Sequence, residues 1–484
     1  SGHVANKLPP GTIRIRIDQF HFNSFTSAVF SLRNSSLFLS TMEEPIELDT
    51  RLISRTKTVP LGSVINAMTN PNVANVSNSE QQSNVVELPP VDRGFKAWSF
   101  CASACALETF IWGWNNTYGI FQEFYSTNPP FQNSSLISIS AIGTASLAIQ
   151  YIEIIAVIAV CQRYPEKVKP AMWLSLFVCV AALTVSSFAN QVWQLIILQG
   201  VIFGLAAGVL YAPIIMWLSE WFVQRRGLAG GIIFGGSGIG GFAFPLAIGA
   251  CLDKIGFSWT MRVWAIILGV CCSLALFGSN PRLPVRKPGI DRPRSSWPSG
   301  MTNFIKNPLL LCMLATNAVQ ALGFFPVSVF ISTYTSALTT STISPTIVLA
   351  LFNASSVVCY IFFGRICDSY PYAAVILFSG LGSALGAFLL WGFATHLGLI
   401  FAFALVFGGL SGGFPGVWPA AATEIAGPVH EHVSLAFGAF GVVKGIAAIV
   451  GPIIAAALHD KSKTASYERY GSHGYRKVEI FVGT

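Results

Sequence analysis

Charged residues are scarce in this chain of 484 residues: Asp, Glu, Lys and Arg make up 10% of it, against roughly 25% in soluble proteins. Hydrophobic residues make up 53%, and the mean hydropathy is +0.60. Water-bounded domains could not bury this apolar excess, so a soluble multidomain protein is excluded. The composition instead predicts a polytopic membrane protein surrounded by lipid.

The sequence also lacks the patterns of metal, nucleotide and catalytic sites. Its ten cysteines fall within or beside apolar runs and have no metal-type spacing, so we interpret them as buried thiols. No nucleotide-binding motif or catalytic constellation is present, so we expect no metal, no cofactor and no enzyme activity. The net charge of +8 comes from the N-terminal tail and short connections, which argues against nucleic-acid binding.

Residues 1–94 contain no apolar run long enough to cross a membrane, and they are rich in Ser, Asn and Thr. We expect a disordered cytoplasmic tail. Before Met42 the tail carries four basic residues and a single acid, Asp18. Two interpretations of residues 1–41 stay open: an organelle presequence, or upstream sequence translated ahead of a start at Met42.

Apolar segments of spanning length follow from Phe95 onward, and lipid requires each of them to be helical. Basic residues gather in the connections on one side, which we therefore expect to face the cytoplasm together with the N-terminus. We also expect prolines to interrupt the fourth, seventh and tenth spans. The eleven segments are 96–124, 136–160, 171–189, 192–219, 228–250, 260–278, 308–334, 344–366, 372–394, 397–423 and 433–458.

An internal repeat relates the two halves of the chain. The basic loop 279–306 separates a predicted bundle of six helices, 95–278, from a second bundle, 307–484, with five helices and the start of a sixth. A twofold repeat requires a twelfth helix, so we expect the sequence to be truncated within it. The matches are Leu228-Ala229 with Leu435-Ala436, Pro245 with Pro452, and Tyr164-Pro165 with Tyr370-Pro371.

One glycine-rich stretch carries a family resemblance. Residues Glu220 to Gly231, EWFVQRRGLAGG, closely resemble the fourth-to-fifth helix signature of the monocarboxylate transporter family within the major facilitator superfamily. Asp92-Arg93-Gly94-Phe95 resembles a variant of that family's first motif, most similar to the fungal branch. The resemblance covers about residues 90–484. It implies an all-α major facilitator fold, with two pseudo-symmetric six-helix bundles and alternating access.

The chain departs from the superfamily pattern in ways that affect gating. Members usually carry Gly-x-x-x-Asp-Arg between the second and third helices, but Gln162-Arg163 stands there, and only the second half keeps Gly364-Arg365-x-x-Asp368. We therefore expect asymmetric gating contacts. Arg225 and Arg226 are gating residues or simple positive-inside anchors. The gating or signature residues implied by the resemblance are Arg225, Arg226, Gly231, Gly364, Arg365 and Asp368.

Another departure concerns coupling. In the animal branch a lysine in the first helix and an Asp/Arg pair in the eighth bind protons and anions, but those places hold Asn116, Asn353 and Tyr360. The resemblance alone therefore does not imply that this chain transports monocarboxylates with protons. Such transport has to rest on other charged residues in the spans.

Three ionisable residues lie deep in the spans: Glu108, Glu153 and Lys444. Each would be costly against lipid, so all three should face the bundle interior. The resemblance places Glu153 and Lys444 where the second and eleventh helices meet, as an exchanging pair or a static structural one. Lys444, whose repeat partner is Ser237, could also attract an anionic substrate. Glu108 is either a protonatable coupling group or a neutral packing acid.

These features favour a secondary active transporter for a small organic solute in a lipid bilayer, with a monocarboxylate as the favoured substrate, protons as the coupling ion and the plasma membrane as its location. The alternatives are a carrier of a neutral or larger metabolite, a non-transporting membrane sensor, or a truncated inactive product. The sequence does not determine the oligomeric state. Further candidate substrate contacts are Asn115, Asn116, Tyr118, Tyr211, Phe325, Asn353 and Trp418.

Overall fold

A computed structural model of the protein describes residues 88–285, 304–339, 343–460 and 469–484. Every regular element within these ranges is a helix, as expected where backbone groups must be satisfied without water. Most of the predicted disordered tail, up to residue 87, lies outside the described residues. Residues 286–303 of the predicted inter-bundle loop lie outside them as well.

The helices follow the apolar segments of the sequence closely. Local signals fix several ends: the Ser135 hydroxyl accepts a hydrogen bond from the Ser138 N–H at the start of α5, and Asn307 caps α11 directly before Pro308. The first half contains α3 (Phe95–Asn116), α4 (Tyr118–Thr127), α5 (Leu136–Arg163), η2 (Pro165–Lys167), α6 (Val168–Ser186), α7 (Val192–Leu195), η3 (Ile196–Ile202), α8 (Phe203–Trp221) and α9 (Arg226–Gly278). The second half contains α11 (Pro308–Leu338), α12 (Ser344–Cys367), α13 (Tyr372–Leu385), η4 (Gly386–Trp391), α14 (Leu397–Gly412), η5 (Phe414–Val417), α15 (Trp418–Ala426), α16 (His430–Leu458), η7 (Ser472–Gly474) and α17 (Arg476–Gly483).

Within the described ranges, nine helices are long and apolar enough to cross a membrane. They account for ten of the eleven predicted spans, because α9 contains two of them. The remaining predicted span, 96–124, corresponds to α3 and the start of α4. The short α17 begins where the twelfth span was expected, and the continuation of the sequence beyond it stays a prediction.

α9 has 53 residues, which at about 1.5 Å per residue is far longer than a bilayer is thick. It reverses direction at Gly256, whose φ of 72° is accessible to glycine without strain. Both arms pack on α3: Gly236 lies against Cys105, and Gly278 lies against Ser103. The two predicted spans 228–250 and 260–278 therefore form an antiparallel pair.

The predicted span 96–124 is helical, with an interruption of one residue: α3 ends at Asn116 and α4 begins at Tyr118. Thr117 between them has φ −89° and ψ −10°, and its hydroxyl donates a hydrogen bond to the Gly113 carbonyl oxygen at 2.8 Å. The prolines behave differently from expectation. α8 and α11 continue through Pro213 and Pro326, whereas the tenth span does divide into α14, η5 and α15 at Pro415.

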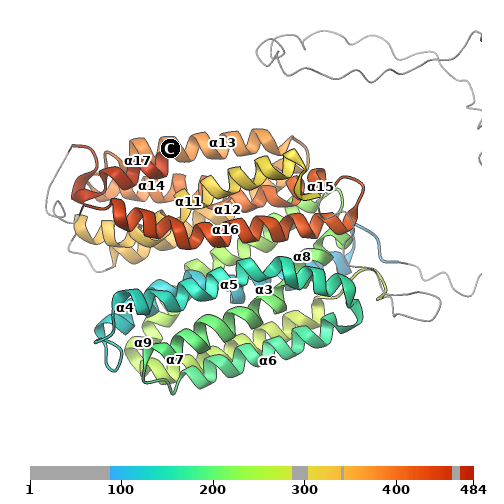
Figure 1. Ribbon diagram of the computed structural model, residues 1–484, viewed down its shortest axis with the longest axis horizontal. Helices are drawn as coiled ribbons and strands as arrows, with labels where there is room; N and C mark the ends of the chain where they lie inside the picture. Colours follow the sequence, from blue (N-terminus) through green and yellow to red (C-terminus); the bar gives the residue numbers. More distant parts are fainter. Residues whose placement is uncertain (1–87, 286–303, 340–342, 461–468) are drawn as a thin grey trace, which may run out of the picture. The chain divides into compact units, whose positions relative to one another are not determined.

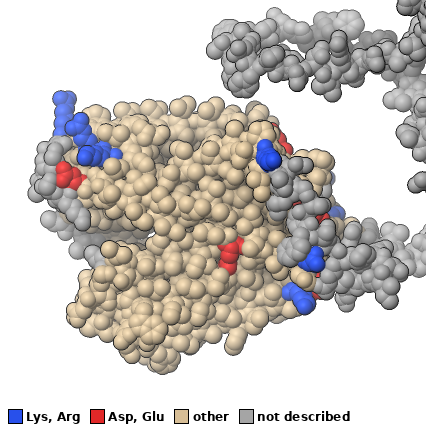
Figure 2. Space-filling model, viewed as in Figure 1, with Lys and Arg blue, Asp and Glu red and all other residues tan. Residues whose placement is uncertain are grey.

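The helices of each half pack mainly against one another, and the largest contacts between the halves are those of α9 with α12 and of α5 with α16. Figure 1 shows α5 and α16 side by side along this junction. Charged side chains gather near the two ends of the helices and leave a broad belt with few charges (Figure 2). We name one end the signature end: it is formed by residues 88–94, 163–168, 221–226, 367–372 and 426–430.

Candidate functional site

A buried lysine lies at the junction of the two halves. Lys444, in the middle of α16, is only 4% exposed. Its Nζ lies 5.2 Å from the ring centre of Trp418, 5.7 Å from that of Phe324 and 6.0 Å from that of Tyr151. In the described part of the chain Lys444 forms no salt bridge. Cation–π attraction to these aromatic faces therefore replaces only part of its lost hydration.

The acid that interacts electrostatically with Lys444 is Glu108 of α3. Glu108 is 5% exposed, and its carboxyl lies beside the Tyr211 hydroxyl of α8. The two groups do not reach normal hydrogen-bond geometry, since Glu108 Oε2 and Tyr211 Oη are both buried without a hydrogen-bond partner. α3, α8 and α16 thus bring an acid, a base and a phenol together from both halves of the chain.

Two indole N–H groups near this pair are also unpaired. Trp112 packs against Tyr151 and Tyr211, with ring centres 4.4 and 5.9 Å apart, and Trp418 packs around Lys444. Trp112 Nε1 and Trp418 Nε1 are buried and have no hydrogen-bond partner. An unsatisfied buried donor costs about 1–3 kcal/mol, and such atoms in a native fold require an explanation. A ligand or ordered water with acceptor oxygens would satisfy them.

The structure does not bring Glu153 to Lys444. α16 packs on the face of α5 that carries Tyr151 and Ile155, against Gly441, Gly445 and Gly438. Glu153 lies two residues from Tyr151, on a different face, and its carboxyl packs against Gly208 of α8. Glu153 Oε1 is buried without a hydrogen-bond partner, although the residue as a whole is half-buried. The position of Glu153 offers no contact with the Lys444 site.

The amide candidates bond mainly to helix backbone. Asn116 Nδ2 donates to the Ser237 carbonyl oxygen at 3.1 Å, and Asn353 Nδ2 donates to that of Leu349 at 3.0 Å and, across the junction, to that of Gly241 at 3.4 Å. Asn115 Oδ1 accepts from the Ser146 hydroxyl, while its Nδ2 stays unpaired. These amides therefore join helices, and Asn115 alone among them keeps a free donor.

The remaining candidates have packing contacts. The Ser237 hydroxyl donates to the Phe234 carbonyl oxygen, and the Tyr118 hydroxyl donates to that of Ile139. Phe325 belongs to a small apolar cluster with Ala321 and Ala447. Of the predicted substrate contacts, the structure thus gathers Glu108, Tyr211 and Trp418 around Lys444.

Sequence reasoning missed two members of this site. Tyr151 and Phe324 provide two of the three aromatic faces around Lys444. Phe324 directly precedes the predicted contact Phe325, so the sequence drew attention to the neighbouring position.

The signature end is closed by contacts between the halves. The Asp368 carboxylate, after α12, accepts hydrogen bonds from the N–H groups of Gly227 at 2.7 Å and Leu228 at 3.0 Å, at the start of α9. Burial raises the pKa of the Asp368 carboxyl, while these two N–H groups and Arg365 act in the opposite direction. Negative charge at a helix N-terminus is stabilising, so Asp368 holds α12 against α9.

Three arginines at the signature end act differently. The Arg226 guanidinium donates to the Thr423 hydroxyl of α15 and therefore crosses between the halves. Arg365 Nη1 donates only to Ser369 Oγ, at 3.3 Å, within its own half. The Arg225 N–H donates to the Asp92 carboxylate at 2.9 Å, which fixes the loop before α9 to the start of the first helix. The sequence motif thus combines a crossing contact with anchors internal to each half.

Glycines allow the closest approach at this end. A side chain at Gly231 of α9 would meet the backbone of Tyr360 in α12, and Gly227 and Gly364 face each other in the same way. A pocket of about 410 Å³ beside them is lined by Gln224, Arg225, Leu228, Arg365, Asp368 and Ser369. Small residues at such crossings are typical of membrane helices.

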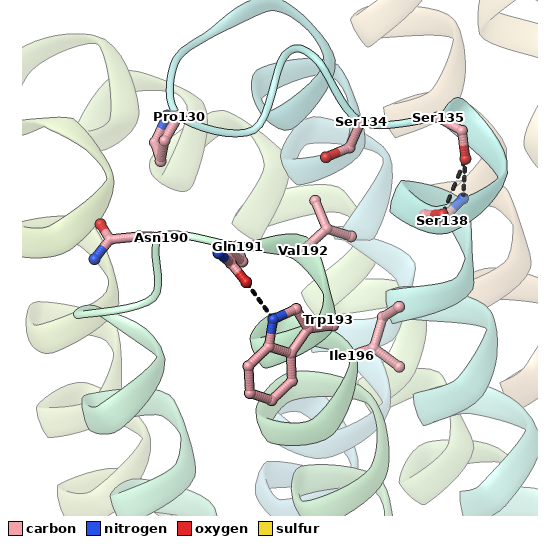
Figure 3. A pocket seen from close by; sticks show the side chains of 9 residues that line it. All are labelled: Pro130, Ser134, Ser135, Ser138, Asn190, Gln191, Val192, Trp193 and Ile196. Carbon is pink, nitrogen blue, oxygen red and sulfur yellow. Dashed lines mark hydrogen bonds between the residues drawn. The ribbon is translucent and has the colours of Figure 1, made fainter.

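A second pocket, of about 420 Å³, lies at the opposite end (Figure 3). In it the Trp193 indole donates a hydrogen bond to Gln191 Oε1. None of the lining residues is charged, so the pocket offers no ionic partner for a solute. They are Pro130, Ser134, Ser135, Ser138, Asn190, Gln191, Val192, Trp193 and Ile196.

Replacing Asp368 with asparagine should open the signature end. The neutral amide retains one acceptor but loses the charge-assisted bonds to the α9 N–H groups, so the open population should rise about tenfold. Spin labels at Val223 and Tyr370, which are 58% and 67% exposed, would report the separation. Arg93→Gln is the control, because Arg93 is an exposed charge at the same end and, within the described residues, donates no hydrogen bond across the halves. An unchanged distance distribution in Asp368→Asn would refute this role.

Comparisons with known proteins agree with the fold. The family model of the Major Facilitator Superfamily matches residues 104–346 and 313–464. MFS-type transporter 1 of Ophiocordyceps sp. is 27% identical, over 84% of this chain and 88% of its own length. The aspyridones efflux protein of Emericella nidulans is 26% identical, over 84% of this chain and 80% of its own. An MFS-type transporter of Gibberella moniliformis is 28% identical, over 84% of this chain and 91% of its own length.

The family match covers most of the chain, and these relatives align with 84% of it. The helices that cross the belt of Figure 2 are the spans that such a transporter needs. The protein therefore belongs to the Major Facilitator Superfamily and is a multi-pass membrane transporter.

Proposed function

We propose that the protein is a secondary active transporter that moves a small organic anion, with a monocarboxylate as the favoured substrate, by alternating access. The observation that carries this proposal is Lys444: a buried ammonium without a salt bridge in the described ranges, between the two halves of the fold. An ammonium inside a membrane protein is costly unless it has an anionic partner. A bound carboxylate would supply that partner.

The groups around Lys444 support an anionic substrate. The unpaired Trp112 Nε1, Trp418 Nε1 and Tyr211 Oη are all able to donate hydrogen bonds. A carboxylate accepts hydrogen bonds at both oxygens, so it could satisfy several of these donors along with the ammonium. The site therefore suits an acceptor-rich solute better than a donor-rich or cationic one.

Glu108 supports proton coupling in this proposal. When Glu108 is ionised, its charge balances Lys444 electrostatically, and a second anion at the site is disfavoured. When Glu108 is protonated, Lys444 is left with excess positive charge and can take the substrate anion. Proton and anion would then bind together and cross together, which is symport.

Export of a neutral or larger metabolite is the second candidate function. The similarity to the aspyridones efflux protein favours it, as does the aromatic lining provided by Trp112, Tyr151 and Trp418. In both candidates we propose a place in the fungal, monocarboxylate-transporter-like branch. We also propose the plasma membrane as the location and a cytoplasmic signature end and N-terminus. The proposed bundles are 95–278 and 307–484.

Uptake into proteoliposomes tests the main candidate. The purified protein should accumulate a labelled monocarboxylate when the lumen is more alkaline than the outside, and a proton ionophore should abolish the accumulation. Efflux of a larger metabolite with no monocarboxylate uptake would favour the second candidate. A correctly folded protein that moves no solute in either direction would favour a membrane sensor.

Glu108→Gln should remove the proton dependence. The amide cannot release a proton, so Lys444 stays uncompensated, and the substrate should bind with similar affinity at any pH. We expect exchange of substrate across the vesicle membrane to persist while accumulation driven by the proton gradient is lost. Glu153→Gln is the control, since Glu153 does not contact the Lys444 site. Normal gradient-driven accumulation by Glu108→Gln would exclude Glu108 as the coupling group.

A further inference from the structure

The internal repeat gives Asp368 a counterpart in the first half. Aligning Tyr164-Pro165 with Tyr370-Pro371 places Gln162 at the position of Asp368, because each lies two residues before the tyrosine. Gln162 is the next-to-last residue of α5, directly before the signature end, and Asp368 follows α12 at that end. α5 packs on α16 of the other half, just as α12 packs on α9. The two residues therefore occupy equivalent junctions between the halves.

Both residues bond near the start of the helix across the junction, but with opposite polarity. Asp368 accepts from two backbone N–H groups of α9, at 2.7 and 3.0 Å. Gln162 Nε2 instead donates to Ser434 Oγ at 2.8 Å and to the Glu431 carbonyl oxygen at 3.0 Å, in α16. Gln162 Oε1 is buried without a partner. The amide thus satisfies only its donor half.

This difference in polarity makes the two contacts unequal. A carboxylate at a helix N-terminus gains from both charge-assisted hydrogen bonds and the helix dipole. A neutral amide that donates near the start of the helix gains nothing from the positive end of that dipole. The unpaired Oε1 carries a desolvation cost that solvent would relieve once the junction opens. The α5–α16 contact should therefore be weaker than the α9–α12 contact.

We propose that Gln162 is a positioning residue of the transport cycle. It makes the α5–α16 contact weaker than the equivalent α9–α12 contact, so α5 and α16 separate first when the signature end opens. The proposal goes beyond the proposed function and does not depend on which solute is carried. It requires only that the halves move relative to each other. A carboxylate at both positions would give the two contacts similar strength, whereas the glutamine leaves the α5–α16 contact weaker.

Distances measured without any solute test the order of opening. One pair of spin labels, at Lys167 and Val429, reports the α5–α16 side, and another, at Val223 and Tyr370, reports the α9–α12 side; all four side chains are exposed. In the otherwise unchanged protein, the first pair should show the larger population of long distances. Equal populations at the two pairs, or a larger one at the second, would overturn the proposal.

Substitutions at Gln162 test its role directly. Gln162→Ala removes two neutral hydrogen bonds but also the cost of the unpaired Oε1, so we expect a net rise of about fivefold in the open population at the α5–α16 pair. That increase should be smaller than the increase that Asp368→Asn causes on its own side. Ser434→Ala removes the partner hydroxyl and should act in the same direction as Gln162→Ala. An effect of Gln162→Ala equal to or greater than that of Asp368→Asn would contradict the proposal.

The substitution Gln162→Glu tests the role with a measurement that a purely structural residue would not change. Gln162→Glu places a carboxylate at the N-terminus of α16, so it should reduce the open population and slow turnover while leaving the KM for solute unchanged. Faster turnover in Gln162→Glu, or a change confined to KM, would overturn the proposal. Thermal unfolding of each variant identifies any loss of fold. The distances between the labels do not depend on the solute. A failure of the proposed role of Gln162 can therefore be distinguished from a failure of the proposed function.

Discussion

Replacing Lys444 with glutamine is expected to reduce transport of an organic anion by at least about thirtyfold, since removing one partner of a buried charge pair costs about 2–5 kcal/mol. The loss has two sources: the anion has no ammonium to bind, and the buried Glu108 loses the positive charge that balances it. Glu108 would then hold its proton and could no longer couple. The measurement is the initial rate of uptake into proteoliposomes at saturating proton gradient.

The chain offers a matched control for this substitution. Lys169 of α6 also lies over an aromatic ring, that of Trp217 at 5.6 Å, and its Nζ donates to the Leu276 carbonyl oxygen at 2.7 Å. It lies in the first half and takes no part in the Lys444 site, so Lys169→Gln should leave the rate near normal. Lys444→Arg keeps the charge and should retain part of the activity. Full activity in Lys444→Gln would exclude an anion site at this lysine.

The existence of the Lys444 site could be predicted from the sequence, but not its partner. A lysine deep in an apolar span is conspicuous, and the energetic cost of burying it indicates function. Its neighbour depends on which face of α5 meets α16. Tyr151 and Glu153 differ by two residues, which corresponds to about 200° around a helix, and fold-level analogy does not fix that rotation. The structure places Tyr151, not Glu153, next to Lys444.

The spans themselves were predictable because lipid permits only one solution for an apolar segment of that length. The interruptions within the spans were harder to predict. The chain divides α3 from α4 at Thr117, where no proline stands, while Pro213 and Pro326 leave their helices unbroken. Neighbouring helices compensate for a missing N–H in a membrane protein, so proline alone is a weak signal there. In the sequence, Gln162 is conspicuous only as a departure from a motif. Its hydrogen bonds could not be predicted, because they depend on the position of α16.

Replacing Gly231 with leucine is expected to prevent the signature end from closing. A Cβ at this position would overlap the Tyr360 carbonyl oxygen, and its next neighbours are the Tyr360 carbonyl carbon at 2.9 Å and Ile361 Cα at 3.1 Å. Because these atoms are backbone, no side-chain rotation can make room, and α9 must move away from α12. Overpacking typically costs about 1–3 kcal/mol, and an overlap with backbone stands at the upper end of that range, so the closed population should fall by about a hundredfold.

Transport should fall with the closed population, because alternating access needs the signature end to close in every cycle. The Val223 and Tyr370 labels should report a long distance in Gly231→Leu, and uptake should be nearly lost although the protein still folds. Gly380→Leu is the control: Gly380 of α13 is exposed, and no atom lies within 4 Å of the position that a Cβ would take there. If Gly231→Leu kept the short distance and normal uptake, the α9–α12 crossing would not be the contact that closes this end. The glycine would then serve helix packing within one state only, and Asp368 would need a different explanation.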